Sequence, residues 1–414
     1  MSGKYVDSMF SLKKILVWVK RGIKKFLSTA LSSLDKRVPK NDRYWIFPVY
    51  FLGKGHFSDN MLAVFEEVKN DPSIRKVLLK RHADLSVGGK NVITLPMRSP
   101  LAVWYLLRSG VLFVQHSVWL DFAEAQYQIV DLLDRKIINL WHGIPIKDIS
   151  HRNTGIINER ALKEMENYWV IASSKNDCQN MQKAFFKTPP DHFWITGLPR
   201  NDFLVKEERR LPNICRKDIE TIRSVCGNKK LILYAPTYRE TNVDGAGHYS
   251  FSDEELERLE RWLRANDAVM GIRYHPYRRP KSYEKMLRRE RFIDLSDAKV
   301  ADVRIAIRMA EIVITDYSSL YVDALYISRR CISFAYDYAH YMQKQRGFFY
   351  DFEEVFPGPI CKNFDALLQA LKATEGGLSE EEQKKIVSLQ KFFFEYLDEN
   401  NARRVVDRVR ELIG

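Results

Sequence analysis

Short runs of β-branched and aromatic residues alternate along the chain with longer helical stretches, and this alternation restricts the fold more than any other feature. The runs form two series, separated by residues 205–218. The first series is RYWIFPVY, RKVLL, NVITL, VLFVQH, KIINLW, YWVIAS and FWITG, and the second is KLILYAP, VMGIRYHP, RFIDL, EIVITD and RCISFAY. Strands separated by helices predict a parallel sheet with crossover connections. Two such series predict two doubly wound α/β domains, and a length of 414 residues favours the same number.

The first forty residues predict a basic amphipathic helix. The segment SLKKILVWVKRGIKKFLSTALSSL places its apolar residues on one helical face, and its lysines and arginines fall mostly elsewhere. A helix of this kind commonly lies in the plane of an anionic membrane surface. We therefore expect residues 1–38 to associate with a membrane. The alternative is a helix that packs on its own domain or on a partner chain.

The remaining chain divides into three further parts. The last part begins at Ser379, where Glu382 three residues later completes a capping box, and it reads as two helices broken near Asn400. The predicted domains are the amphipathic helix over residues 1–38, an N-terminal Rossmann-like domain over 40–208, a C-terminal Rossmann-like domain over 215–375, and helices over 378–414.

Charge and cysteine content narrow the class of protein. The net charge of +13 favours an anionic partner, which is a nucleic acid, an anionic membrane or a phosphate-rich substrate. The five cysteines form no CxxC pair, which argues against a zinc site or a disulfide framework and suits a reducing compartment. No apolar run approaches the roughly 20 residues of a membrane span, and no signal-peptide cleavage pattern is evident.

Chemically active residue types recur where the predicted strands end, and ligands of open α/β sheets bind beyond the carboxyl ends of strands. Each residue also has a plainer interpretation, such as a structural histidine, a turn or a helix cap. Their recurrence over successive strands favours a site for a ligand with two phosphates. They are His142, Gly143 and Lys147 after KIINLW, Arg200, Asn201 and Asp202 after FWITG, Thr237 and Arg239 after KLILYAP, Arg273 and His275 within VMGIRYHP, and Asp316, Ser318, Ser319 and Asp323 after EIVITD.

The segment VITDYSSLYVDAL reads as a strand that ends at a turn and restarts as a helix. A helix N-terminus offers free N–H groups and the positive end of the dipole, so it can hold a phosphate. We therefore expect the backbone and hydroxyl groups of Ser318 and Ser319 to bind phosphates. Asp316 or Asp323 would face a sugar hydroxyl or orient the loop, and the sequence leaves both open.

Six separated motifs together resemble one known family. WHGIPIK, GLPRND, YAPTYR, YHP, TDYSSLYVD and RGFFYDFEEVFPGPI are similar, in this order, to the CDP-glycerol:poly(glycerophosphate) glycerophosphotransferase family, over about residues 110–410. Before residue 110 the resemblance is thinner, although GKGHFSDN resembles the Gly-rich N-terminal loop of such folds. The resemblance implies a GT-B-like architecture, in which two Rossmann-like domains face a cleft. It implies that the domain over 40–208 binds the acceptor, that the domain over 215–375 binds the CDP-linked donor, and that the helices over 378–414 pack back on the first domain.

The resemblance also implies an activity. Such enzymes transfer a polyol phosphate from a CDP-polyol to a hydroxyl of a growing or lipid-linked cell-surface polymer and release CMP, in teichoic acid or capsule biosynthesis. For this chain we expect CDP-glycerol or another CDP-polyol as donor and a lipid-linked or saccharide polymer as acceptor. A lipid-linked acceptor would explain the N-terminal helix and would place the protein in the cytoplasm, peripherally on the inner face of the cell membrane.

Two histidines take different roles in this chemistry. The attacking hydroxyl must lose its proton, and a neutral histidine is suited to take it. We assign this role to His142, because it comes from the domain where the acceptor should dock, and we expect His275 to contact the diphosphate. By resemblance these are the family's two important histidines. The other expected donor-binding residues are Thr237, Arg239, Arg273, Asp316, Ser318, Ser319, Asp323 and Arg346, and the expected acceptor-binding residues are Gly143, Lys147, Arg200, Asn201 and Asp202.

The sequence is compatible with several alternatives for the cofactor, the donor and the partner. The sequence has no DxD triplet of the sort that holds Mg²⁺ between phosphates, so we expect no required cofactor and no tightly bound metal, although Mg²⁺ use is compatible. A GT-B glycosyltransferase with a nucleotide sugar donor would share the fold. Ribitol phosphate could replace glycerol phosphate, and one unit or many could be added. A nucleic-acid partner is not expected, because the chain has no RNP-like aromatic pattern and no zinc finger.

Overall fold

The computed structural model describes residues 22, 26, 29–49, 57–80, 85, 87–122, 132–149, 159–237, 247–274, 281–344 and 348–414. The chain forms two compact units, the first made of Met1–Val49 with Lys69–Asn139 and the second of Tyr50–Val68 with Leu140–Gly414. Most of the amphipathic helix predicted over residues 1–38 lies outside the described residues. Residues 29–37 are described and are helical.

The first unit is built on a parallel sheet whose strands follow the order β3-β2-β1-β4-β5. Its centre is apolar, since every residue of β4 is buried and the rings of Phe47 and Phe113 stack at 4.6 Å. Helix α3 begins after Ser99, whose side chain accepts the N–H of Ala102. The elements are β1 (Asn41–Pro48), β2 (Arg75–Lys80), β3 (Val92–Pro96), α3 (Pro100–Arg108), β4 (Ser109–Val114), α4 (Val118–Asp121) and β5 (Lys136–Asn139).

The second unit contains the parallel pair β6 and β7 and a six-stranded parallel sheet of order β10-β9-β8-β11-β12-β13. The α/β class with two parallel sheets is therefore confirmed, and all twelve predicted runs contain strands. The strands are β6 (Tyr168–Ala172), β7 (Phe193–Ile195), β8 (Lys230–Tyr234), β9 (Ala268–Ile272), β10 (Phe292–Asp294), β11 (Ile312–Thr315), β12 (Arg330–Phe334) and β13 (Ile360–Cys361).

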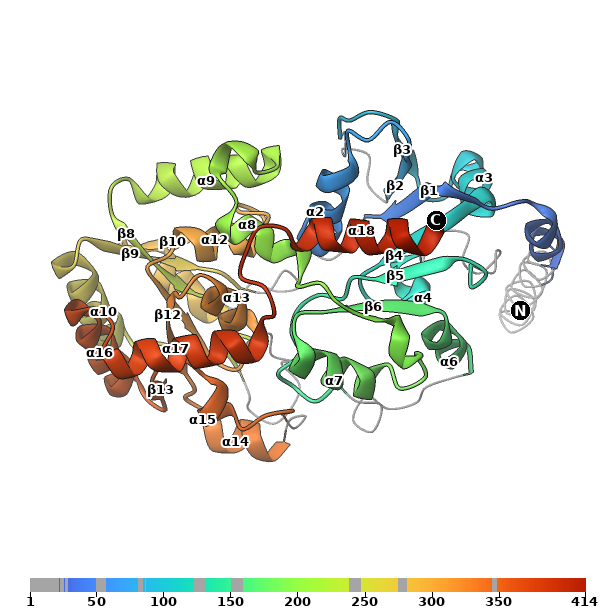
Figure 1. The fold of residues 1–414 in the computed structure, drawn as a ribbon. Helices are drawn as coiled ribbons and strands as arrows, with labels where there is room; N and C mark the ends of the chain where they lie inside the picture. The colour runs from blue at the N-terminus through green and yellow to red at the C-terminus, as the bar shows by residue number, and fades with distance from the viewer. Residues whose placement is uncertain are drawn as a thin grey trace, which may run out of the picture. The chain divides into compact units, whose positions relative to one another are not determined.

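Helices surround these strands in the second unit (Figure 1). Short 3₁₀ turns connect several of them, among which η3 (Pro199–Asn201) matters for the site. The helices are α2 (Asp59–Val68), α6 (Glu159–Glu166), α7 (Lys175–Ala184), α8 (Asp202–Val205), α9 (Asn213–Cys226), α10 (Asp253–Ala265), α11 (Glu284–Leu287), α12 (Val303–Met309), α13 (Leu320–Tyr326), α14 (Tyr338–Lys344), α15 (Phe352–Val355), α16 (Phe364–Ala373), α17 (Glu380–Phe393) and α18 (Asn401–Ile413).

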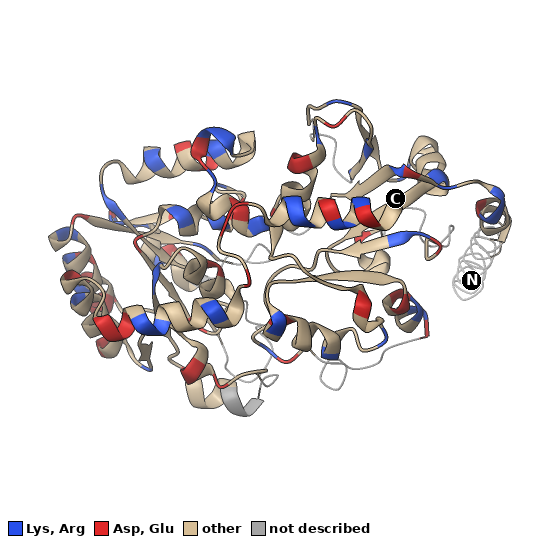
Figure 2. Ribbon diagram, in the orientation of Figure 1, with Lys and Arg blue, Asp and Glu red and all other residues tan. Residues whose placement is uncertain are grey.

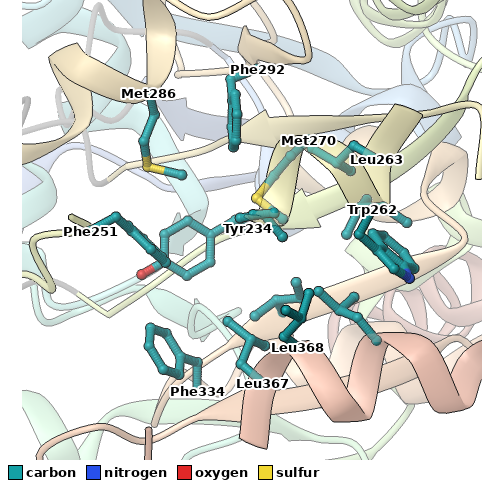
Figure 3. Close-up of a cluster of buried hydrophobic side chains, with 14 of the residues drawn as sticks. Tyr234, Phe251, Trp262, Leu263, Met270, Met286, Phe292, Phe334, Leu367 and Leu368 are labelled. Carbon is teal, nitrogen blue, oxygen red and sulfur yellow. The ribbon is translucent and has the colours of Figure 1, made fainter. Parts of the chain in front are cut away.

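One face of the six-stranded sheet packs on α10 and α16. Figure 3 shows Tyr234 and Met270 of the sheet lying among Trp262 of α10 and Leu367 and Leu368 of α16. Alternate residues of each strand face this cluster because side chains of a strand point to opposite faces in turn. Full burial of an apolar side chain of this size contributes about 1.5–3 kcal/mol, so this layer fixes the frame from which the loops at the strand ends project.

The C-terminal helices match the prediction from sequence. Ser379 and Glu382 form the capping box of α17, and α18 begins at Asn401. Helix α18 packs against α2 (Figure 1), and it also packs against η3. Its first N–H groups, those of Asn401 and Ala402, donate to the buried carboxylate of Asp202 at 2.9 and 3.0 Å. Asp202 therefore caps α18 from a distant part of the chain, and burial raises its pKa to about 7.

Basic and acidic residues are interspersed along α10, α17 and α18 (Figure 2). Exposed pairs such as Arg264 with Glu290, at 2.8 Å, belong to these mixed surfaces. Pairs of this kind contribute little to stability, because water and salt screen them. Among the described helices, none combines the length with the apolar character that crossing a bilayer requires.

Candidate active site

The strand order of the six-stranded sheet reverses between β8 and β11, because β9 and β10 lie beyond β8 while β12 and β13 lie beyond β11. Open α/β sheets bind their ligands at such a point, outside the carboxyl ends of the two strands. Thr237 follows β8 and Asp316 follows β11, and the two residues meet. The Asp316 carboxylate accepts the N–H of Thr237 at 2.8 Å and that of Tyr317 at 2.6 Å. Asp316 thus holds the loops of both central strands together.

The Thr237 hydroxyl is buried and has no hydrogen-bond partner among the residues that the structure describes. A buried polar group without a partner is costly and calls for an explanation, such as a ligand. Its place at the reversal of strand order is where a nucleotide diphosphate binds in this class of fold. The Thr237 hydroxyl is therefore a candidate contact for the donor.

Ser318 and Ser319 lie directly before α13, on the loop that Asp316 holds. The Ser318 hydroxyl accepts the N–H of Leu320 at 3.4 Å, while the Ser319 side chain makes no capping bond. Between these serines and the strand, the buried ring of Tyr317 stacks on Tyr341 at 3.8 Å. The turn that carries the two serines is therefore anchored by the buried Tyr317 and by Asp316.

His142 lies on an irregular segment after β5 and is exposed. Its ring stacks on the ring of Trp141, with centroids 4.1 Å apart. On its C-terminal side this segment contacts Phe348 and Phe349. Phe349 donates its N–H to the carbonyl of Ile146 at 2.9 Å, and Lys147 forms an isolated antiparallel bridge with Phe348. The Lys147 ammonium also lies 5.3 Å from the ring centre of Tyr341.

Arg200 and Asp323, predicted for the acceptor and the donor respectively, are paired with each other at 2.9 Å and expose only 6% of their side chains each. Three more charged residues, Asp59, Arg304 and Asp302, complete a buried cluster. Asp59 lies 3.5 Å from Arg200 and 3.0 Å from Arg304, and Arg304 also contacts Asp302 at 2.7 Å.

The cluster shifts its two central carboxyl groups in opposite directions. Burial raises the pKa of Asp323 above its ordinary value, and the nearby arginines offset only part of this effect. For Asp59 burial also acts upward, but the positive charges of Arg304 and Arg200 outweigh it and lower its pKa to about 2. Asp59 is therefore a firmly ionised partner of both arginines.

The remaining predicted residues are placed as follows. Asn201 and Asp202 are buried, and Asp202 caps α18. Arg273 donates to the carbonyl groups of Leu295 and Val300 at 3.1 and 2.6 Å, and burial lowers its pKa to about 10. Among the described residues, no three His, Cys, Asp or Glu side chains are grouped as metal ligands. His275, Arg239 and Arg346 lie outside the described residues.

Comparison with known proteins agrees with this architecture. A sequence model of the CDP-glycerol:poly(glycerophosphate) glycerophosphotransferase family matches residues 31–411. A teichoic acid poly(glycerol phosphate) polymerase of Bacillus spizizenii is 28% identical over 396 residues, which cover 91% of this chain and 93% of that protein. A teichoic acid ribitol-phosphate primase of the same organism is 25% identical over 407 residues, covering 95% of this chain and 97% of that protein.

The fold has a counterpart among solved structures. The wall teichoic acid polymerase TagF superposes with a TM-score of 0.74 at 21% identity, over 100% of this chain and 98% of that chain. The resemblance carried by the six motifs is thus confirmed over nearly the whole sequence. The chain belongs to the CDP-glycerol:poly(glycerophosphate) glycerophosphotransferase family.

Proposed function

We propose that the protein transfers glycerol phosphate from CDP-glycerol to a terminal hydroxyl of a growing or lipid-linked polymer in teichoic acid synthesis. Family membership makes it a transferase of polyol phosphate from a CDP-polyol. The observation that supports a diphosphate donor at this site is the unpartnered Thr237 hydroxyl at the reversal of strand order, where the Thr237 backbone is bound to Asp316 of the loop that carries Ser318 and Ser319. These hydroxyl groups suit the phosphate oxygens of a nucleotide diphosphate.

In the proposed reaction the acceptor oxygen attacks the phosphorus that carries glycerol. The bond from this phosphorus to the bridging oxygen breaks, so CMP leaves with the bond's electron pair. The proton of the acceptor hydroxyl passes to the imidazole of His142, which is exposed and therefore reachable by a polymer end. The rest of catalysis comes from positioning and charge neutralisation, as in phosphoryl transfer generally. His275, Arg239 and Arg346 are expected to supply positive charge, and the reaction is expected to need no tightly bound metal.

The proposal is tested by measuring the donor preference of the protein. The measurement is calorimetric titration with CDP-glycerol, CDP-ribitol, CDP, UDP-glucose and UDP-GlcNAc, each with and without Mg²⁺. We expect CDP-glycerol to bind most tightly. Thr237→Val should weaken that binding about 10- to 100-fold, since hydrogen bonds to charged groups contribute about 1.5–3 kcal/mol. Thr196→Val is the matched control, because the buried Thr196 hydroxyl already donates to the carbonyl of Gly197 at 3.0 Å.

The outcomes of the titration separate the alternatives. If CDP-ribitol binds more tightly than CDP-glycerol, the transferred group is ribitol phosphate and not glycerol phosphate. Preference for a UDP-sugar would replace the proposal by a glycosyltransferase. Equal binding by wild type and Thr237→Val would remove Thr237 from the donor site.

We further propose that the N-terminal segment holds the protein at an anionic membrane surface, on the cytoplasmic face. The basic amphipathic pattern supports this, and so does the exposure of Phe26 and Leu34, at 73% and 47%. The described end of this helix is held firmly within the first unit. The buried Asp35 carboxylate accepts two bonds from Arg135, at 2.9 and 2.6 Å, and one from Lys40 at 2.6 Å.

Removal of residues 1–28 tests this surface and leaves Asp35 with its partners. We expect sedimentation with anionic vesicles to fall at least about tenfold, since each basic residue near such a surface contributes about 1 kcal/mol. Activity on a soluble acceptor should persist. Vesicles of neutral lipid are the control. Unchanged sedimentation would mean that the helix packs on its own domain or on a partner chain instead.

A further inference from the structure

The backbone that carries His142 adopts conformations that L-amino acids rarely adopt. Trp141 has a φ of +48° and Gly143 a φ of +136°. A bulky residue with positive φ costs on the order of 1–3 kcal/mol, and such strain persists only where the surroundings hold it. Strain of this kind clusters at functional sites. The groups that hold this segment are therefore of interest for His142.

Asn60 and Arg200 hold three consecutive carbonyl groups of the segment. The Asn60 side-chain amide donates to the carbonyls of Leu140 and Trp141 at 2.8 and 3.2 Å. The Arg200 Nη1 donates to the carbonyl of His142 at 2.6 Å. The two residues also bind each other, because the Asn60 Oδ1 accepts the Arg200 N–H at 2.9 Å. Asn60 is fully buried and Arg200 nearly so, at 0% and 5% exposed.

The guanidinium of Arg200 packs directly against the segment. A Cβ at Gly143 would lie 2.5 Å from Arg200 Nη2 and 3.1 Å from its Cζ. Glycine is therefore required beside His142 both by its positive φ and by the approach of Arg200. A movement of Arg200 must therefore shift the backbone at His142 and Gly143 or leave a gap between that backbone and the guanidinium.

The same guanidinium binds the element that follows the serine turn. Its Nη2 donates to Asp323 of α13 at 2.9 Å, and α13 begins immediately after Ser318 and Ser319. A planar guanidinium fixes the direction of its N–H groups relative to each other. One side chain therefore ties the backbone of His142 to the helix that carries the serine turn.

We propose that Arg200 and Asn60 are positioning residues for the transfer, which act through the backbone of His142 and through Asp323 and do not touch the substrate. They set the place of the His142 ring relative to the serine turn and so relative to the donor phosphates. The proposal rests on the proposed role of His142 as proton acceptor. It assigns to Arg200 a task different from the acceptor contact expected from sequence, and it assigns a task to Asn60, which no strand-end pattern indicates.

Arg200→Lys tests the proposal. Lysine keeps the positive charge in the cluster but lacks the fork that reaches His142 and Asp323 together. Misplacement of a catalytic group by about 1 Å costs about 10²-fold in rate, so we expect kcat to fall by at least about 30-fold while the Kd of CDP-glycerol changes less than about threefold. Asn60→Asp keeps the size of the side chain and should lower kcat in the same way. It replaces the amide N–H donor by a carboxylate oxygen, which cannot donate to the carbonyls of Leu140 and Trp141.

Arg304→Lys is the matched control, since Arg304 belongs to the same buried cluster but contacts Asp59 and Asp302 rather than the His142 segment. It should lower Tm as much as Arg200→Lys does, yet keep kcat within about threefold of wild type. Loss of kcat in proportion to loss of Tm across all three variants would overturn the proposal.

A double-mutant cycle with His142→Ala separates positioning from general weakening. If Arg200 acts through His142, the effect of Arg200→Lys on kcat should shrink below about twofold once His142 is absent. Multiplicative losses would show that Arg200 does not act through His142 and would overturn the inference alone. Near-normal turnover of His142→Ala would remove the proton acceptor itself, and the inference with it.

Discussion

Replacement of His142 by alanine is expected to lower the rate of transfer by about 10²- to 10⁴-fold, the range that general base catalysis contributes. The fold should survive, because His142 is exposed and its ring covers Trp141 at the surface rather than filling the core. Surface substitutions of this kind change stability by about 0.5 kcal/mol or less. The measurement is CMP release from CDP-glycerol in the presence of acceptor, together with Tm.

His192→Ala is the matched control for this prediction. The His192 ring also stacks on a tryptophan, Trp169, with centroids 3.8 Å apart, and its Nδ1 lies 3.1 Å from the carbonyl of Tyr168. Each variant thus removes a histidine ring that stacks on a tryptophan ring. Only His142, however, lies on the segment that Arg200 holds. Turnover of His192→Ala should match wild type. A folded His142→Ala variant with near-normal turnover would exclude His142 as the proton acceptor.

The fold was predictable because its signal is local. Each predicted run contains a strand, since continuous β-branched and aromatic residues mark buried parallel strands. The capping box of Ser379 and Glu382 likewise marks the start of α17 from four adjacent residues. Strand β13 was missed because Ile360–Cys361 is only two residues long and has no pattern of its own. It forms only because β12 offers it a partner.

The sequence predicts which loops form the candidate site, but it does not predict the contacts that the side chains of these loops make. Strand-end patterns select the loops of His142, Thr237 and Asp316, because the carboxyl ends of parallel strands lie at one edge of a sheet. They do not show that Arg200 pairs with Asp323 rather than with a ligand, since that contact joins residues far apart in sequence. Asn60 is the last residue of GKGHFSDN, and the resemblance of this segment to a Gly-rich loop indicates no role for the Asn60 side chain. Only the folded chain shows its amide binding the His142 segment.

The largest predicted loss of stability follows from a substitution in the buried cluster around Arg304. Arg304 exposes only 6% of its side chain and pairs with Asp302 and Asp59 at 2.7 and 3.0 Å. Arg304→Met keeps much of the side-chain volume but leaves two carboxylates without their nearest cation. Breaking a buried pair from one side costs about 3–5 kcal/mol, so we expect a loss of this size in the free energy of unfolding, measured with denaturant. Arg264→Met, which breaks an exposed pair, should leave the free energy of unfolding nearly unchanged.

The same variant should change the response of stability to acid, through Asp59. Its pKa is about 2 in the folded protein, mainly because Arg304 and then Arg200 offset the effect of burial, whereas an unfolded aspartate titrates near 3.9. A lowered pKa contributes stability that is present above pH ~4 and is lost as the pH falls toward 2. This contribution is about 2–3 kcal/mol in wild type, and it should shrink in Arg304→Met because the strongest attraction is gone. The wild type should therefore lose more stability than Arg304→Met between pH 4 and 2. Parallel losses would mean that Asp59 does not depend on Arg304 for its charge.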